Sequence, residues 1–167
     1  MVSIRIQSDI GAARAVLGRY KETAQNPRPL MDIAGGILEN SIRDRFRTSR
    51  GPGGVPWKPS QRVIQGGGGR TLIDKGGLLA SITHVAEDHS VEVGVIAKTP
   101  SAKFAYVHQF GATIRPVRAR MLVFTGPDGH KVFAHAVTIP ARPFVGIDNT
   151  DRADLLEAWT EYLEALK

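Results

Sequence analysis

A stretch rich in glycine and proline, between residues 48 and 71, most constrains the fold because it separates a helical region from a region of short strands. It reads TSRGPGGVPWKPSQRVIQGGGGRT and holds seven glycines and three prolines in 24 residues. Such a segment buries too little apolar surface to offset the entropy lost on ordering. We therefore expect a long mobile loop over about residues 48–71, in which an exposed Trp57 contacts a neighbouring subunit.

Apolar residues at helical spacing between Pro29 and Arg47 predict the clearest helix of the chain. Its apolar stripe consists of Leu30, Ile33, Ala34, Ile37, Leu38, Ile42 and Phe46. Gly35-Gly36 lies inside this helix at a cost of roughly 1 kcal/mol per glycine relative to alanine, so we expect another backbone to approach closely there. On the polar face, Glu39 and Arg43 are spaced for an ion pair.

The chain before this helix opens with an alternating segment, Val2–Gln7, which predicts a short strand. A first helix is expected from a cap at Ser8 or Asp9 to about Thr23. Its predicted buried face consists of Ala12, Ala15, Val16 and Tyr20. The opening residues contain no long apolar run, so we expect neither a signal peptide nor a membrane span.

Short alternating runs after the loop predict two β-hairpins. The first pairs Ile82–Val85 with Val91–Ile96, and the second pairs Met121–Thr125 with Lys131–Val137 around a turn at Gly126–Gly129. A short helix, capped near Asp74, is predicted from Leu78, Leu79 and Ile82. The other predicted elements are a helix at Ser101–Phe110, a strand at Ala112–Ile114, an edge or loop segment at Thr138–Arg142 and a final helix at Asn149–Leu166.

This order of elements predicts an α+β fold in a single domain that spans residues 1–167. We expect one antiparallel β-sheet, made of the two hairpins plus edge strands and packed against the N-terminal and C-terminal helices. The apolar side of the final helix is predicted to consist of Leu155, Leu156, Trp159, Leu163 and Leu166.

Charge is distributed unevenly along a chain whose net charge is +6. Eight basic residues stand against two acidic ones between Arg43 and Lys75, whereas residues 148–167 hold six acidic residues against two basic ones. This asymmetry suits a head-to-tail contact between copies as readily as a contact with nucleic acid. The candidate subunit-interface residues are Arg50, Trp57, Lys58, Arg62 and Arg70 in the loop, and Asp154, Glu157, Glu161 and Glu164 on the final helix.

No pattern in the sequence specifies a reaction centre. The five histidines lack HExxH spacing, and the absence of cysteine excludes thiolate chemistry and disulfides. There is no GxSxG elbow, and Gly66–Thr71 lacks the GK[ST] ending of a phosphate loop. An enzyme would need a pocket that joins His108 to a carboxylate such as Asp74. We therefore expect no enzyme activity, no cofactor and no metal site.

Five segments in this order resemble the phage virion morphogenesis family, the tail-completion proteins of contractile-tailed and Mu-like phages and prophages. The segments are Ile42–Phe46, Gly54–Pro59, Leu72–Ile82, Tyr106–Gly111 and Ile139–Gly146. Their signature residues are Tyr106, His108, Gln109, Phe110, Gly111, Pro140, Ala141, Arg142, Pro143 and Phe144. One departure is Lys75, which stands where the family pattern often has threonine before the glycine.

The resemblance implies a structural protein of the phage neck or tail end that acts in tail completion and head–tail joining. It implies assembly in the host cytoplasm, a final place in the virion, and a homo-oligomeric ring, commonly of six copies. The expected partners are other copies and other neck and tail proteins, with no membrane and no catalytic residues.

Two hypotheses about the basic loop remain open from the sequence. In the first, the loop and the acidic helix are the two faces of a heterologous ring contact. Neutralising Arg50, Lys58, Arg62 and Arg70 would then weaken assembly in a salt-sensitive way. In the second, the loop belongs to a module that binds nucleic acid without sequence preference, and non-specific contact with DNA passing through an assembly is a related expectation.

Overall fold

The computed structural model describes residues 10–66, 68–95, 99–126 and 128–167. The predicted strand at Val2–Gln7 and the caps at Ser8 and Asp9 lie outside these residues. The helices are α1 (Gly11–Gln25), α2 (Arg28–Thr48), the 3-10 turn η1 (Pro52–Gly54), α3 (Gln61–Ile64), α4 (Gly77–Ala80), α5 (Ala102–Phe110) and α6 (Asn149–Glu164). The strands are β1 (Ile82–Ala86), β2 (Val91–Val95), β3 (Ala112–Ile114), β4 (Leu122–Thr125), β5 (Lys131–Ala134) and β6 (Val137–Ile139).

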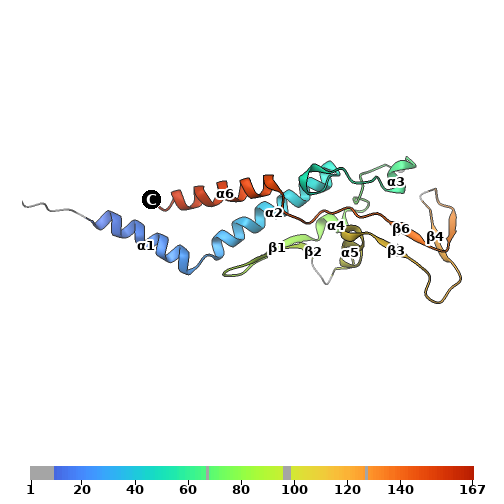
Figure 1. The fold of residues 1–167 in the computed structure, drawn as a ribbon, viewed down its shortest axis with the longest axis horizontal. Helices are drawn as coiled ribbons and strands as arrows, with labels where there is room; N and C mark the ends of the chain where they lie inside the picture. The colour runs from blue at the N-terminus through green and yellow to red at the C-terminus, as the bar shows by residue number, and fades with distance from the viewer. Residues whose placement is uncertain (1–9, 67, 96–98, 127) are drawn as a thin grey trace, which may run out of the picture.

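The long helix α2 is the centre of the molecule. It packs against the β1–β2 hairpin on one side and against α6 on the other, so that three layers follow one another (Figure 1). Proline in its first turn and the apolar stripe explain why this segment is helical. The main core gathers at its C-terminal end and consists of Ile42, Phe46, Trp57, Ile82, Ala105 and Phe144.

The α+β class predicted from the sequence is confirmed, but the prediction of one sheet is wrong. The described strands form three separate two-stranded antiparallel sheets, β1–β2, β3–β6 and β4–β5. Both predicted hairpins form, with Thr83 opposite Gly94 in the first and Val123 opposite Phe133 in the second. The third sheet joins two strands that the sequence left as edges, because β6 pairs with β3.

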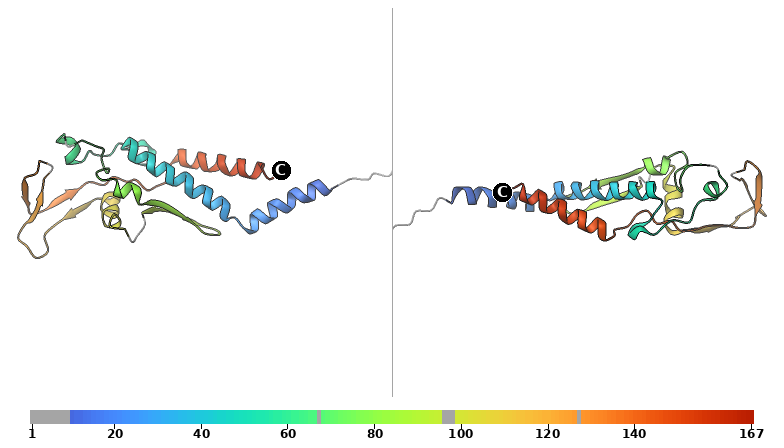
Figure 2. Two further views of the ribbon diagram at one scale, coloured as in Figure 1. Left: turned by 180° about the vertical axis from the view of Figure 1, so that it is seen from behind. Right: turned by 90° about the horizontal axis from the view of Figure 1, so that it is seen from above.

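The molecule is elongated, with α1 at one end and the β4–β5 hairpin at the other (Figures 1 and 2). Helix α1 has no buried residue, and the predicted burial of Ala12 and Ala15 is wrong. Its described polar contacts include bonds to the end of α6, where the Tyr20 hydroxyl donates to the carbonyl of Leu163 at 3.0 Å. Leu156, predicted on the apolar side of α6, is 67% exposed.

Gly35 in α2 faces a side chain, so the expectation of a close backbone neighbour is wrong. A Cβ at Gly35 would lie 2.6 Å from Cγ of His84 and 2.9 Å from Cγ2 of Val91 on the β1–β2 hairpin, whereas a Cβ at Gly36 would meet nothing within 4 Å. The glycine at position 35 lets the hairpin lie close against the helix.

These neighbouring glycines form a matched pair of variants. Gly35→Ala is expected to destabilise the protein by about 1–3 kcal/mol because the added methyl displaces the His84 ring. Gly36→Ala is expected to stabilise it by about 0.5–1 kcal/mol because alanine favours the helix and has free space. Urea unfolding followed by circular dichroism measures both values. Equal effects at the two positions would contradict the packing of His84 against Gly35.

His84 also connects the hairpin to α2 by charge. Its Nδ1 lies 2.7 Å from Oε2 of Glu39, and its Nε2 lies 3.4 Å from Oδ1 of Asp32. The hydrogen bond to Glu39 raises the pKa of His84 against the opposing effect of burial, and Asp32 adds to the rise. Glu39 also forms the predicted ion pair with Arg43, at 2.6 Å.

This arrangement predicts a pH dependence of stability. Because the folded-state pKa of His84 is raised, its stabilising contribution is complete below the unfolded-state pKa of about 6.5 and is lost as the pH rises through the folded-state value. The difference in melting temperature between the natural protein and His84→Gln should therefore shrink as the pH rises from 6 to 9. His89→Gln, in the exposed hairpin turn, is the control and should leave the pH profile unchanged. A constant His84→Gln difference across this range would contradict the charged contact.

Candidate assembly site

The two signature segments of the sequence meet at the C-terminal end of α5. The side-chain amide of Gln109 accepts hydrogen bonds from the backbone N–H groups of Phe144 (3.0 Å) and Val145 (3.1 Å) and donates to the carbonyl of Val145 (2.8 Å). One side chain thus pairs with this backbone as a neighbouring strand would. Gln109 therefore fixes the path of the segment that carries Pro143 and Phe144.

Arg142 extends this junction to the glycine- and proline-rich segment. Its backbone N–H donates to the carbonyl of His108 at 2.6 Å, and its side chain is buried. Nε donates to the carbonyl of Lys58 at 2.7 Å, and Nη2 donates to the carbonyl of Pro59 at 3.3 Å. The guanidinium therefore fixes the backbone of the glycine- and proline-rich segment, which has too few apolar residues to become ordered by itself.

Gly111 ends α5 where no other residue fits well. Its φ is +74°, a region that residues with a Cβ seldom adopt. A Cβ there would also lie 2.9 Å from the backbone nitrogen of Ala141 and 3.1 Å from the carbonyl oxygen of Ile139. The glycine of the first signature segment is thus required for the close approach of the second.

Trp57 lies in the core, and the prediction that it is an exposed anchor for a neighbour is wrong. Its side chain is 6% exposed and packs edge-on against Phe46, with ring centroids 5.6 Å apart. Phe46 makes a similar contact with Phe144, at 5.3 Å, and Nε1 of Trp57 donates to the carbonyl of Pro143 at 2.8 Å. The apolar ring and the N–H group both find their partners inside the chain, so this residue is not available to a second subunit in this conformation.

The rest of the glycine- and proline-rich segment has local structure of its own. It contains η1, α3 and isolated bridges between Arg50 and Pro56 and between Arg70 and Ile73. Its mobility in solution stays a prediction.

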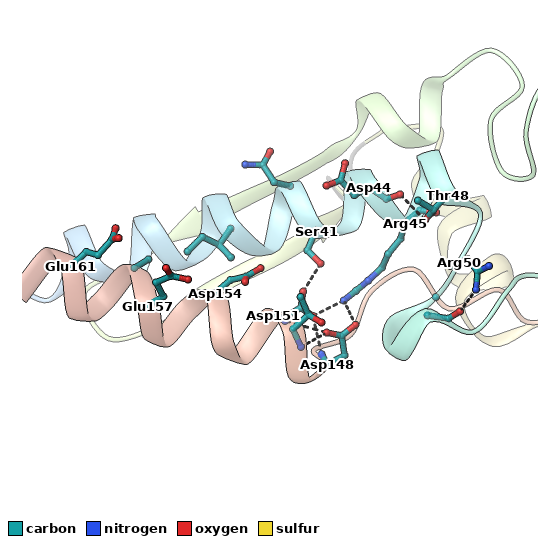
Figure 3. A pocket seen from close by; sticks show the side chains of 16 residues that line it. Ser41, Asp44, Arg45, Thr48, Arg50, Asp148, Asp151, Asp154, Glu157 and Glu161 are labelled. Atoms are coloured by element: carbon teal, nitrogen blue, oxygen red, sulfur yellow. Dashed lines mark hydrogen bonds and ion pairs between the residues drawn. The ribbon is translucent and has the colours of Figure 1, made fainter.

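A buried ion pair that the sequence did not reveal joins α2 to α6. Nη2 of Arg45 lies 2.5 Å from Oδ2 of Asp151, and both side chains are buried. Nη1 of Arg45 donates to the carbonyls of Phe144 and Gly146, at 3.1 and 2.8 Å. Asp151 also accepts a hydrogen bond from the hydroxyl of Ser41 (Figure 3). The available signal was the spacing of Asp148 and Asp151, which is that of a capping box.

The capping box at the start of α6 completes this ion-pair network. Oδ1 of Asp148 accepts from the backbone N–H groups of Thr150 and Asp151, and Oδ2 of Asp151 accepts from the N–H of Asp148. Oδ2 of Asp148 accepts from the N–H of Gly53 at 2.8 Å, which draws the η1 turn against the helix. This bond and the N–H of Asp151 lower the pKa of Asp148.

Beside this ion pair lies a groove of about 810 Å³ between α2 and α6. Asp154, Glu157 and Glu161 line it in a row along α6, and Asp44 adds a carboxylate from α2 to those of Asp148 and Asp151 (Figure 3). The predicted acidic stripe therefore opens onto a concave surface. Glu164 is exposed beyond the groove and lies 3.6 Å from Nζ of Lys167.

The basic residues of the loop are partly engaged within the chain. Arg50 donates to the carbonyl of Gly54 at 2.8 Å and lines the acidic groove. Arg62 donates to the carbonyls of Gly68, Arg70 and Ile73 and lies 3.8 Å from Asp74. Lys58 and Arg70 have exposed side chains. The loop thus presents less free positive charge than its sequence predicts.

The exposed face of α5 is apolar. Tyr106 and Phe110 are 68% and 65% exposed, and their rings lie with centroids 4.9 Å apart. They border a groove of about 410 Å³, which is also lined by Val95, Ala102, Ala105, Gln109, Phe144 and Val145. Of the signature residues, these two therefore face outward, whereas Gln109 and Arg142 face inward.

The groups proposed for an enzyme are not brought together. Nδ1 of His108 is buried without a hydrogen-bond partner among the described residues, and burial together with the charge of Arg142 lowers the pKa of His108. Asp74 is exposed and pairs with Arg62 instead. Within the described parts of the chain, no cluster of histidine, aspartate and glutamate side chains could hold a metal ion. No described helix is long and apolar enough to cross a membrane.

Comparisons with known proteins agree with the signature segments. A family model described as the phage virion morphogenesis family matches residues 8–164. The chain is similar to Mu-like prophage FluMu G protein 2 of Haemophilus influenzae, with 28% identity over 164 residues that cover 96% of this chain and 98% of the relative. No solved structure matches the chain.

Proposed function

The chain belongs to the phage virion morphogenesis family, and on this premise we propose that it is a structural protein that acts in tail completion and head–tail joining. Membership in the family gives it a role in virion assembly. The finer proposal is a homo-oligomeric ring of six copies at the neck or tail end, formed in the host cytoplasm and bound to other neck and tail proteins. It assigns no reaction, cofactor or metal to the chain.

The proposal rests mainly on the apolar surface that remains exposed to solvent in a single copy of the chain. Apolar side chains exposed by more than half include Phe104, Tyr106 and Phe110 on α5 and Val123 and Phe133 on the β4–β5 hairpin. Contiguous exposed apolar surface is typical of proteins that bury it against a partner. These positions lie on different parts of an elongated molecule, which suits contacts between unlike surfaces.

Removing the gene from a phage that carries it tests this function. We expect heads and tails that assemble separately but fail to join, with infectivity restored by the gene supplied in trans. Electron microscopy of the particles and native mass spectrometry of the purified protein measure the two parts of the proposal. Joined, infectious particles in the absence of the protein would overturn it.

A second candidate function, non-specific binding of nucleic acid, now rests on other residues than the loop. Of the eight basic residues between Arg43 and Lys75, five donate hydrogen bonds within the chain. These five are Arg43, Arg45, Arg47, Arg50 and Arg62. The residues that favour this candidate are Arg115, Arg118 and Arg120, which are exposed. Tight DNA binding by the monomer, with an affinity that falls steeply with salt, would support this candidate over the assembly role.

A further inference from the structure

One part of the molecule, the arm, projects from one end without a partner. We define the arm as the described residues 115–126 and 128–136, which include the β4–β5 hairpin. These two strands pair with each other and with no other described strand (Figure 1). Val123 and Phe133 are paired on one face, 56% and 60% exposed, and Phe124 and Val132 are paired on the other, 41% and 37% exposed. A lone two-stranded hairpin with two apolar faces is marginally stable in water, so the arm needs a surface to cover it.

The arm is also basic. It contains Arg115, Arg118, Arg120 and Lys131 against a single acidic residue, Asp128. The three arginines are exposed, and none of them takes part in the ion pairs that the described residues form. A surface that receives the arm should therefore combine carboxylates with some apolar area.

The acidic face of α6 has this combination. We define this face by Asp154, Glu157 and Glu161, which line the groove together with the apolar side chains of Ile37 and Ala158. Helix α6 runs from the middle of the molecule toward the end that carries α1, away from the arm (Figures 1 and 2). The arm of one chain lies too far from the acidic face of the same chain to reach it, whereas the arm of a second chain is free to do so.

We propose that the arm of one copy docks on the acidic face of α6 of the next copy. The inference rests on the proposed function, because it names the contact that joins neighbouring subunits of the ring. The contact is heterologous, because it joins two different surfaces. Repeating it from copy to copy closes a ring when the rotation between neighbouring copies is a whole fraction of 360°. In this arrangement the arm takes the place that the sequence suggested for the basic loop.

A charge exchange tests the pairing. Arg115→Glu, Arg118→Glu and Arg120→Glu together should weaken self-association by about 10-fold or more, and so should Asp154→Lys, Glu157→Lys and Glu161→Lys together. An equimolar mixture of the two variants contains two matched pairs of surfaces, the reversed arm with the reversed face and the natural arm with the natural face. The mixture should therefore regain association as mixed oligomers in which the two variants alternate, and native mass spectrometry detects them. The combined six-fold variant should regain self-association. All six side chains are exposed, and circular dichroism verifies that each variant is folded.

The matched control reverses three other basic charges. Lys58 and Arg70 lie on the exposed part of the loop, and the exposed Lys75 lies shortly after it. Lys58→Glu, Arg70→Glu and Lys75→Glu together are expected to change self-association by less than about 3-fold. Loss of assembly in this control, with the arm variant unaffected, would overturn the proposal in favour of the loop. Failure of the six-fold variant to regain association while it remains folded would overturn it as well.

Cross-linking locates the contact directly, because the natural chain contains no cysteine. When assembled particles are treated with a mild oxidant that forms disulfides, Arg118→Cys and Glu157→Cys in one chain should give a ladder of covalently joined copies, whereas Arg118→Cys with Lys103→Cys on α5 should give none. Preferential joining through Lys103→Cys would place the arm on α5 and overturn the inference. Incorporation into functional particles without any joining through Glu157→Cys would overturn it too, while the proposed function would stand. If the basic arm binds DNA instead, the variant with the three arginines replaced would associate as the natural protein does but would bind DNA more weakly.

Discussion

Replacing Arg45 with methionine is expected to destabilise the protein by about 3–5 kcal/mol, because the substitution leaves a carboxylate buried without its partner charge. Asp151 is 2% exposed and lies 2.5 Å from the guanidinium. Methionine fills much of the volume of the arginine stem, so the loss of charge and hydrogen bonds dominates over a cavity. The carbonyls of Phe144 and Gly146 lose their donors in the same variant. Urea unfolding followed by circular dichroism gives the free energy of unfolding.

The same helix offers a matched control for this effect. Arg47 pairs with Asp44 at 2.8 Å, but the two side chains are 69% and 62% exposed. Arg47→Met is therefore expected to change the free energy of unfolding by about 0–1 kcal/mol, since water solvates the remaining carboxylate. If the two variants were equally stable, the ion pair between α2 and α6 would contribute no more than a surface pair, and the burial of Asp151 would be wrong.

Local sequence patterns predicted most of the helices and strands. The stripe of α2, the alternation of β1, β2, β4 and β5 and the glycine at the end of α5 act over a few residues, and the structure confirms these elements. The division into three sheets could not be predicted in this way, because the pairing of β3 with β6 joins segments that are separated by the whole arm. Strand propensity says nothing about which distant strand becomes a neighbour.

The signature residues were predicted as a set, but their roles were not. Gln109 and Arg142 act on backbone groups of residues 144–145 and 58–59, which lie far along the chain from them. A side-chain amide or guanidinium that binds a distant backbone leaves no periodic pattern in the sequence. Tyr106 and Phe110, in contrast, face outward, so one short signature serves both the interior and the surface.

The contacts of the loop with the rest of the chain could not be predicted for the same reason. Composition measures how much apolar surface a segment can bury by itself, and for residues 48–71 that amount is small. The structure supplies the missing contacts from elsewhere: Arg142 binds the carbonyls of Lys58 and Pro59, and Asp148 binds the N–H of Gly53. These contacts hold the segment in a position in which the side chain of Trp57 packs in the core.

The position of Trp57 leads to the other large expected effect. Trp57→Ala should lower the free energy of unfolding of the isolated monomer by about 3–5 kcal/mol, because it removes a buried ring from Phe46 and leaves the carbonyl of Pro143 without its donor. Val55→Ala, in the same segment but 64% exposed, is the control and should change it by less than about 0.5 kcal/mol. Urea unfolding of monomeric protein at low concentration separates the core role from an interface role. If Trp57 were an interface residue, Trp57→Ala would leave the stability of the monomer unchanged and would weaken only self-association. That result would contradict the burial of Trp57 in the core and support the exposed position that the sequence predicted.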